Sequence, residues 1–442
     1  MPDSQQEEPG RRDRAPAATD VASPLVLCGA RLADGRTVDV RLGGGRIEAV
    51  GTAGSLAPPH PRPSGPTPAA AGDPHALPNQ TAAQTPAQSV DLTGYLLLPA
   101  PAEPHAHYDT ALTARCAGPP PQSPDEAQRR ATEAALTQLS QGATAVRTHV
   151  HIGDVAGLRN LEAVLAARRA LRGLADLTAV AVPRVVTGAA GADGLAMLRE
   201  ALDMGATVVG GCPDLDPDPA GCTEALLSVA ADHGCAVDLH TDGDDPARLA
   251  RLAAAAGGLR PSVTVGPCGG MARLPREVAQ RAAEQLAAAG MTVVCLPQGG
   301  CGLMTRQAPE RVAPVGLLRA AGVRVAAGSG ALRDTANPVG RGDPLEAAYL
   351  LASLGEARPE AAYEAVSARA REALGLPEVR VEAGFPAELV AVRGESVAGA
   401  LSLAYSRLVV HRGRVVARTS AVREFCDSPV AAALGLPRQS HR

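Results

Sequence analysis

From Tyr95 onward the chain alternates between short apolar segments rich in β-branched residues and longer segments rich in Ala, Leu, Arg and Glu. The short segments have the length of buried strands, and the longer segments have the length and composition of helices. Strands that alternate with helices form a parallel sheet, and eight such units close into a (β/α)8 barrel. The pattern therefore predicts the α/β class, with a TIM-type barrel over residues 95–375.

Eight strands are expected, and they begin at residues 95, 143, 177, 207, 236, 262, 291 and 323. The helices expected between and after them cover residues 125–141, 155–172, 191–203, 223–233, 245–256, 275–289, 308–321 and 343–354, followed by a helix pair at 359–374.

Short β-rich segments flank the expected barrel on both sides, in residues 24–94 and 376–426. Turn signals such as ADG and GGG separate them, so we expect both flanks to pair into one small β-sandwich around an inserted barrel. Residues 52–88 are dominated by Pro, Ala, Gly, Ser and Thr, and are predicted to form a flexible insertion. Residues 1–23 and 427–442 are expected to be loose tails.

The basic residues exclude several chemistries, because all 42 are arginine in a chain of 442 residues. A Schiff-base lysine, a P-loop lysine and a carboxylated lysine between two metals are impossible without lysine. The formal net charge of −4 and the 2% aromatic content disfavour nucleic acid as a partner. Nine cysteines without a CxxC pair indicate reduced thiols and a cytoplasmic location. The sequence contains no apolar run of about 18 residues, so no membrane span is predicted.

Two histidines one residue apart, His105 and His107, follow the first apolar run. Alternate side chains at a strand end point the same way, so both imidazoles can face one divalent metal. Taken alone, they could equally be two surface histidines. However, polar residues also follow the other strands, at the face where such barrels carry their chemistry; they are Arg147, His149, His151, Arg184, Asp214, His240, Asp242, Cys268, Gln298 and Ser329.

Several segments in matching order resemble the cytosine deaminase-like branch of the amidohydrolase superfamily. They are PAPAEPHAHYDTALT, VRTHV, VAVPR, GATVVGGCP, DLHTD, VTVGPC, VVCLPQ and GSGALRDTANPVGRGDPLE. Members of that family are metal-dependent hydrolases that remove an amino group from rings such as cytosine or a triazine. The resemblance implies one divalent metal ion, Zn or Fe, with His105, His107 and His240 as ligands.

Four positions depart from the family pattern. The glutamate that shuttles protons in the family corresponds to Gly243, and the histidine that polarises the attacked carbon corresponds to Pro267. The aspartate that binds the metal and accepts a proton corresponds to Gly330, and the glutamine that binds the substrate amide corresponds to Arg184. Since a general acid or base contributes about 10² to 10⁴ in rate, ordinary deamination is expected to be impaired.

Other side chains are candidates for the missing roles. Asp242 is a candidate base, or a structural carboxylate that pairs with Arg. His149 and His151 are candidates for substrate binding, for a fourth metal ligand or for an acid, or they are supporting core residues. Arg184 fits an anionic or carbonyl-rich substrate, or a salt bridge to Asp214 or Asp216. Cys268 is a candidate nucleophile or a small buried residue.

Two functions remain open from the sequence. The first is a hydrolase of the cytosine deaminase type, acting on a carbon–nitrogen (non-peptide) bond of a small cyclic amidine or amide. The second is a catalytically disabled homologue that binds a ligand or a metal. A small-molecule substrate and homo-oligomer formation are expected, without nucleic acid or membrane as partner. For the first function, the imidazole nitrogens must converge to within about 4 Å of one another.

Overall fold

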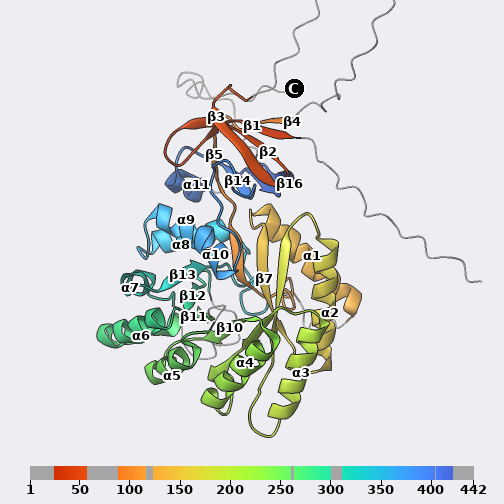
Figure 1. The fold of residues 1–442 in the computed structure, drawn as a ribbon, viewed down its shortest axis with the longest axis vertical. Helices are drawn as coiled ribbons and strands as arrows, with labels where there is room; N and C mark the ends of the chain where they lie inside the picture. The colour runs from red at the N-terminus through yellow and green to blue at the C-terminus, as the bar shows by residue number, and fades with distance from the viewer. Residues whose placement is uncertain are drawn as a thin grey trace, which may run out of the picture.

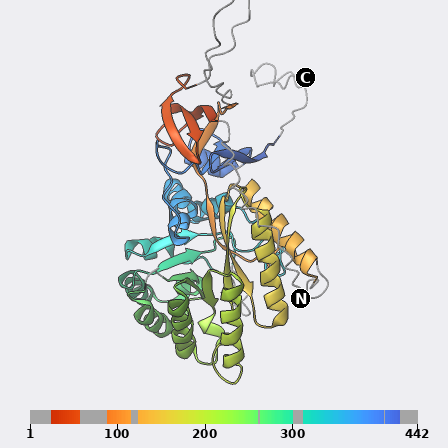
Figure 2. The same ribbon diagram turned by 45° about the vertical axis from the view of Figure 1, so that its right-hand side comes forward.

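The computed structural model describes residues 24–56, 88–115, 123–259, 263–299, 311–403 and 405–421. The tails predicted at residues 1–23 and 427–442 lie outside this part, as do residues 57–87 of the predicted insertion. Two sheets organise the described residues (Figure 1): a barrel surrounded by helices, and a separate sheet built from the two ends of the chain. Figure 2 shows the same arrangement after rotation, with the N-terminal and C-terminal strands together at one end of the barrel.

The barrel is an eight-stranded sheet in which sequential strands are neighbours and run parallel. Its strands are β6 (Ala102–Ala106), β7 (Ala145–His151), β8 (Asp176–Val182), β9 (Val208–Gly211), β10 (Ala236–Thr241), β11 (Thr264–Pro267), β12 (Thr292–Cys295) and β13 (Arg324–Ala327). A parallel bridge between Ala106 and Gly330 links the first strand to the segment after the last, so the barrel is nearly closed. The predicted α/β class and barrel are confirmed.

The helices cover the outside of the barrel and bury Ala and Leu against the strands. They are α1 (Pro124–Ser140), α2 (Val155–Ala170), α3 (Gly191–Met204), α4 (Pro219–His233), α5 (Pro246–Ala256), α6 (Arg276–Ala288), α7 (Val315–Ala320), α8 (Pro344–Ser353), α9 (Pro359–Val366) and α10 (Ala368–Ala373). Two 3-10 turns, η1 (Pro213–Leu215) and η2 (Gly269–Arg273), follow β9 and β11. Within the described residues, no helix is both long and apolar enough to cross a bilayer.

One strand was predicted in the wrong sheet. The apolar run β5 (Tyr95–Pro99) pairs with strands of the other sheet, and the first barrel strand is β6, two residues later. Leu96 and Leu98 of β5 pack into the barrel core, whereas Leu97 packs into the core of the terminal sheet. The run is apolar on both faces because it lies between two cores. His105 consequently lies inside a barrel strand instead of after it.

The terminal sheet joins both ends of the chain, as predicted. Its continuous path runs in the order β16-β15-β14-β5-β1-β2-β3, with β4 paired to β1. The strands not yet given are β1 (Leu25–Arg31), β2 (Thr37–Gly43), β3 (Arg46–Thr52), β4 (Gln88–Asp91), β14 (Leu389–Arg393), β15 (Arg407–His411) and β16 (Arg414–Thr419), with α11 (Val397–Leu403) between β14 and β15. The C-terminal strand β14 pairs antiparallel with β5, so neither end of the chain forms this sheet alone.

Candidate active site

Five histidines from three barrel strands gather at one end of the barrel. His105 lies on β6 and His107 directly follows it, His149 and His151 end β7, and His240 lies near the end of β10. In β6 and β7 the two histidines are two residues apart, so their rings leave the strand on the same side. The rings of His105, His149 and His240 are fully buried, and that of His107 nearly so.

The rings of His105, His107 and His240 lie close together. Nε2 of His107 lies 3.3 Å from Nε2 of His105 and 3.5 Å from Nε2 of His240. His149 joins them, because one ligand atom from each of the four rings lies within 4.8 Å of the other three. Ligands about 2.0 to 2.1 Å from a tetrahedral zinc ion are about 3.3 Å apart. The separations of His107 from His105 and from His240 therefore match those of ligands to one ion.

The electrostatics of the four rings also suit a metal. Burial lowers the pKa of His105, His107 and His149 well below the usual value, and neighbouring imidazoles lower each pKa further. Burial likewise lowers the pKa of His240 to about 4. The four rings are therefore neutral near pH 7, which is the form that binds metal ions. A buried cluster of neutral nitrogen atoms that face one another fits a divalent cation.

Asp109 is a buried carboxylate at this site that the sequence analysis missed. Its Oδ2 atom lies 2.6 Å from Nδ1 of His151 and accepts a hydrogen bond from the backbone amide of His151. Burial alone would raise the pKa of Asp109, but His151 outweighs burial and the pKa falls to about 2. Asp109 also raises the pKa of His151 above its usual value, against the effect of burial. The spacing HAHYD placed Asp109 two residues beyond His107 and was the available signal.

His107, Asp109 and His151 form a second group of potential ligand atoms next to the first. The rings of His107 and His151 are stacked, with centroids 5.6 Å apart. Asp109 holds Nδ1 of His151, while Nε2 is buried without a hydrogen-bond partner in the described part of the chain.

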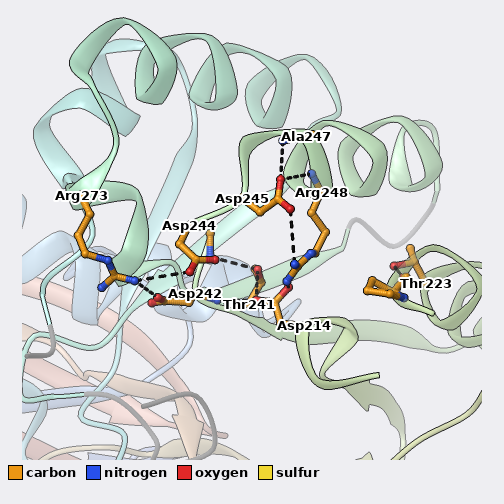
Figure 3. Close-up of polar contacts among 11 residues, drawn as sticks. Asp214, Thr223, Thr241, Asp242, Asp244, Asp245, Ala247, Arg248 and Arg273 are labelled. Carbon is orange, nitrogen blue, oxygen red and sulfur yellow. Dashed lines mark hydrogen bonds and ion pairs between the residues drawn. The ribbon is translucent and has the colours of Figure 1, made fainter. Parts of the chain in front are cut away.

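Asp242 has the structural role that the sequence left open as an alternative. Its carboxylate forms an ion pair with Arg273 and accepts a hydrogen bond from the amide of Gly270 at 2.8 Å. In Figure 3, Arg273 reaches Asp242 and Asp244, and Asp214 lies between Thr241 and Arg248. Among the described residues, neither group of potential metal ligands includes Asp242. This network fixes the loop between β10 and α5 against η1 and η2.

Arg184 follows β8 and is exposed. Neither carboxylate proposed for a salt bridge contacts it: Asp214 pairs with Arg248 at 2.9 Å, and Asp216 binds Thr187 and the amide of Val186. The side chain begins beside Gly153, in the loop after His151, so that a Cβ on Gly153 would lie 2.8 Å from Cβ of Arg184. Arg184 is therefore on the same face as His151.

Two of the four positions that depart from the family pattern, Gly243 and Gly330, lie against apolar side chains. A Cβ on Gly243 would lie 2.8 Å from Cγ of Met271, and a Cβ on Gly330 would lie 3.1 Å from Cδ1 of Leu296. Both glycines have positive φ angles, +72° and +69°, which strain other residues. A side chain at position 243 would therefore crowd Met271, and one at position 330 would, less tightly, crowd Leu296.

Two other residues near the site, one of them predicted, have structural roles. Cys268 is fully buried, and burial raises the pKa of its thiol far above the usual value, which opposes a role as nucleophile. Glu103, which the sequence analysis missed, accepts hydrogen bonds from the amides of His105 at 3.0 Å and Ser329 at 2.9 Å. Burial raises the pKa of Glu103 to about 7 despite these bonds. It joins β6 to the segment after β13, where the barrel closes.

Comparisons with known proteins agree with this geometry. Residues 123–417 match the family model described as Amidohydrolase family. Pterin deaminase from Rhizobium rhizogenes is 29% identical over 299 residues, which are 63% of this chain and 67% of that protein. N-isopropylammelide isopropyl amidohydrolase from a Pseudomonas species is 25% identical over 318 residues, which are 67% of this chain and 75% of that protein.

Solved structures share the fold along most of the chain. N-isopropylammelide isopropylaminohydrolase from Burkholderia multivorans superposes with a TM-score of 0.74 and 26% identity, covering 90% of this chain and 100% of that one. A 5-methylcytosine deaminase from Klebsiella pneumoniae superposes with a TM-score of 0.72 and 23% identity, covering 92% of this chain and 100% of that one. Because the family model spans well over half of its residues, this chain belongs to the amidohydrolase family.

Proposed function

We propose that the protein is a metal-dependent hydrolase that acts on a carbon–nitrogen bond, other than a peptide bond, of a small cyclic amidine or amide. The observation that supports it is the convergence of buried, neutral imidazoles from β6, β7 and β10 at one point. Relatives named as a pterin deaminase and as an N-isopropylammelide amidohydrolase support the same reaction class.

His105, His107 and His240 would hold one divalent ion, zinc or iron. A bound ion supplies Lewis acidity, which makes water acidic enough to serve as a nucleophile near neutral pH. Three neutral imidazoles leave the +2 charge of the ion uncompensated, which favours this effect. The protein therefore retains the part of the chemistry that depends on the ion.

His151 is our candidate for proton transfer, in place of Asp242. Asp109 fixes Nδ1 of His151 at 2.6 Å, so Nε2 is available to take or give a proton. The carboxylate of Asp242 is instead bound by Arg273 and Gly270. Asp242→Asn should therefore leave the shape of the pH–rate profile unchanged, whereas His151→Gln should lower kcat by about 10² to 10⁴.

The substrate is expected to be a small molecule that reaches His151 and Arg184 on the exposed face. Arg184 presents a fixed fork of donors, which suits a carbonyl-rich or anionic ring. We propose neither nucleic acid nor a membrane as a partner. We do propose that the protein forms a homo-oligomer, without assigning an interface to it.

The experiment is release of ammonia or an alkylamine from a panel of pyrimidines, pterins and triazines by protein of measured metal content. We expect at least one substrate to be turned over, and His240→Ala to abolish the turnover together with the bound metal. His233→Gln is the matched control, because His233 is exposed at the end of α4. Turnover that is equal in His240→Ala and in the parent protein would contradict the proposal.

The closed space at Gly243 and Gly330 favours a second candidate function, a homologue that binds a ligand or a metal without catalysis. Met271 and Leu296 stand where two catalytic side chains would need room. Under this alternative, purified protein binds one metal ion per chain through His105, His107 and His240 but turns over no member of the panel.

A further inference from the structure

The ring of His149 lies among the three proposed metal ligands. Its centroid is 4.0 Å from that of His105, 4.7 Å from that of His240 and 5.3 Å from that of His107. The side chain is fully buried. Neither of its ring nitrogens makes a hydrogen bond of normal geometry within the described residues; the ring faces the Ala106 carbonyl, and Asp238 lies 3.6 Å from Nε2. Buried polar groups are rarely left without well-formed hydrogen bonds, so the ring has room for a ligand.

We propose that His149 is the fourth protein ligand of the metal ion, so that the ion is held by four imidazoles. This inference rests on the proposed function, because it concerns the same ion. The carboxylate ligand that the family resemblance implies is replaced by Gly330, and the first group of potential ligand atoms contains only histidines. His149 approaches that group from β7, the neighbour of β6 in the barrel.

Distances within the group permit a single four-coordinate ion. Four nitrogens about 2.0 to 2.1 Å from a tetrahedral ion are about 3.3 Å apart. Nε2 of His107 lies 3.3 Å from Nε2 of His105 and 3.5 Å from Nε2 of His240. No two of the four ligand atoms, that of His149 included, are more than 4.8 Å apart. The four ligand atoms therefore lie near enough to one another to share one ion.

Asp238 is placed to orient His149. Its Oδ1 atom lies 3.6 Å from Nε2 of His149, and its Oδ2 atom is held at 2.9 Å by Nη1 of Arg147. All three side chains are buried. A carboxylate beside a ligating imidazole accepts the N–H that the ring retains and fixes the ring in place. The Arg147–Asp238 pair thus acts as a positioning pair for His149.

Such a ligand set determines which metal binds best. Four neutral imidazoles favour zinc, and they bind ferrous iron more weakly, because affinity rises from Fe²⁺ to Zn²⁺ at a nitrogen site. Four protein ligands also complete the coordination sphere of a tetrahedral ion, as in structural zinc sites. Catalytic zinc instead keeps one coordination position open or expands to five ligands. The role of His149 therefore bears on both candidate functions.

The first test is a titration of metal-free full-length protein with Zn²⁺ in the presence of a chromophoric chelator. Loss of a residue that only supports a metal ligand weakens metal affinity by about 10- to 100-fold. His149→Gln should weaken zinc affinity by more than this, because it removes a ligand. The exposed His233→Gln is the control and should change the affinity by less than a factor of about 10. Circular dichroism of the metal-free variants checks that each is folded.

A second measurement needs no variant. X-ray absorption at the zinc edge of the loaded parent protein should show four imidazole ligands, and the Co²⁺-substituted protein should show the intense visible bands of four-coordinate cobalt. Three imidazoles together with oxygen ligands, or unchanged zinc affinity in His149→Gln, would overturn the role of His149 and leave the proposed function intact. If the parent protein binds no Zn²⁺, both proposals fail together.

Discussion

At the scale of single residues, the contact between Gly243 and Met271 has a measurable consequence. Gly243→Glu should lower the free energy of unfolding by about 1 to 3 kcal/mol, because the new side chain is strained at a positive φ and meets Met271. Met271→Ala alone should cost about 2 to 5 kcal/mol as a cavity in the core. If the two side chains compete for one space, the double variant should be more stable than the sum of the two losses predicts.

Urea unfolding of the four proteins in this cycle measures the coupling. Additive losses would show that Met271 does not occupy the space of a side chain at position 243. Ammonia release by the double variant is a separate readout, since it reports whether a carboxylate returned to this position restores catalysis.

The histidines were predictable one by one, but their partners were not. His105, His107 and His240 carry a spacing and a strand position that indicate metal binding, and the structure brings them together. For Asp109 the only signal was the spacing HAHYD, and Asp238 had none, because the sequence does not say which carboxylate will face which imidazole across neighbouring strands. Asp242 alternates with His240 in sequence, yet the loop turns it toward Arg273.

At the scale of elements, two arginines join the terminal sheet to the barrel in different environments. Arg407 on β15 makes a buried two-point contact with Asp343 before α8, at 2.8 and 2.6 Å. Arg412 reaches Asp176 on β8 at the surface. Arg407→Met should lower the free energy of unfolding by about 3 to 5 kcal/mol, because a buried carboxylate is left unpaired. Arg412→Met should cost about 1 kcal/mol or less.

Urea unfolding with a probe in each part of the protein distinguishes the two contacts. Arg407→Met should also separate the unfolding of the terminal sheet from that of the barrel, if this pair couples them. Equal, small losses in both variants would mean that the buried ion pair contributes no more than the exposed one.

Glu388, directly before β14, supplies a pH-dependent contact with β15. Its Oε2 atom lies 2.8 Å from Nδ1 of His411, and its Oε1 atom accepts a hydrogen bond from the amide of Arg412. Burial alone would raise the pKa of Glu388, but His411 and this amide outweigh burial and lower it. Because the pKa of Glu388 is lower in the folded state, this contact stabilises the folded protein fully above the unfolded pKa of about 4.3. The stabilisation is lost as the pH falls through the folded pKa.

Glu388→Gln should therefore cost about 1 to 3 kcal/mol at pH 7, as expected for a buried charge-assisted hydrogen bond. The difference from the parent protein should shrink as the pH is lowered below about 4. Glu378→Gln, which removes a carboxylate from an exposed pair with Arg380, is the control and should change little. A Glu388→Gln difference that stays constant from pH 7 to the acid limit would contradict the assignment.

The order of strands and helices followed from the sequence because each barrel unit carries its own periodicity and turn signals. The exception was the boundary between the two sheets. The run YLLLP reads as a barrel strand, whereas AEPHA, the true strand β6, contains Glu and His and shows no apolar pattern. Its polar residues are buried because Glu103 bonds Ser329 and His105 faces the other histidines. Tertiary contacts of this kind cannot be seen in a local pattern.

At the scale of the whole molecule, the proposed metal ion would connect opposite sides of the barrel. His105 lies on β6 and His240 on β10, and these strands are four apart in either direction around the eight-stranded ring. An ion that binds the folded barrel, and not the unfolded chain, stabilises it by about 2.7 kcal/mol when present at 100 times its dissociation constant. Removal of metal by a chelator should therefore lower the unfolding temperature of the entire barrel.

Calorimetry of the protein with Zn²⁺, with Mg²⁺ and with chelator alone tests this prediction. Only Zn²⁺ should raise the unfolding temperature, since nitrogen ligands do not suit Mg²⁺. In His105→Ala the difference between the zinc and chelator samples should disappear, while in His233→Gln it should persist. A zinc effect of the same size in His105→Ala would place the ion elsewhere in the molecule. It would also remove the link between β6 and β10 on which the proposed hydrolase and its non-catalytic alternative both depend.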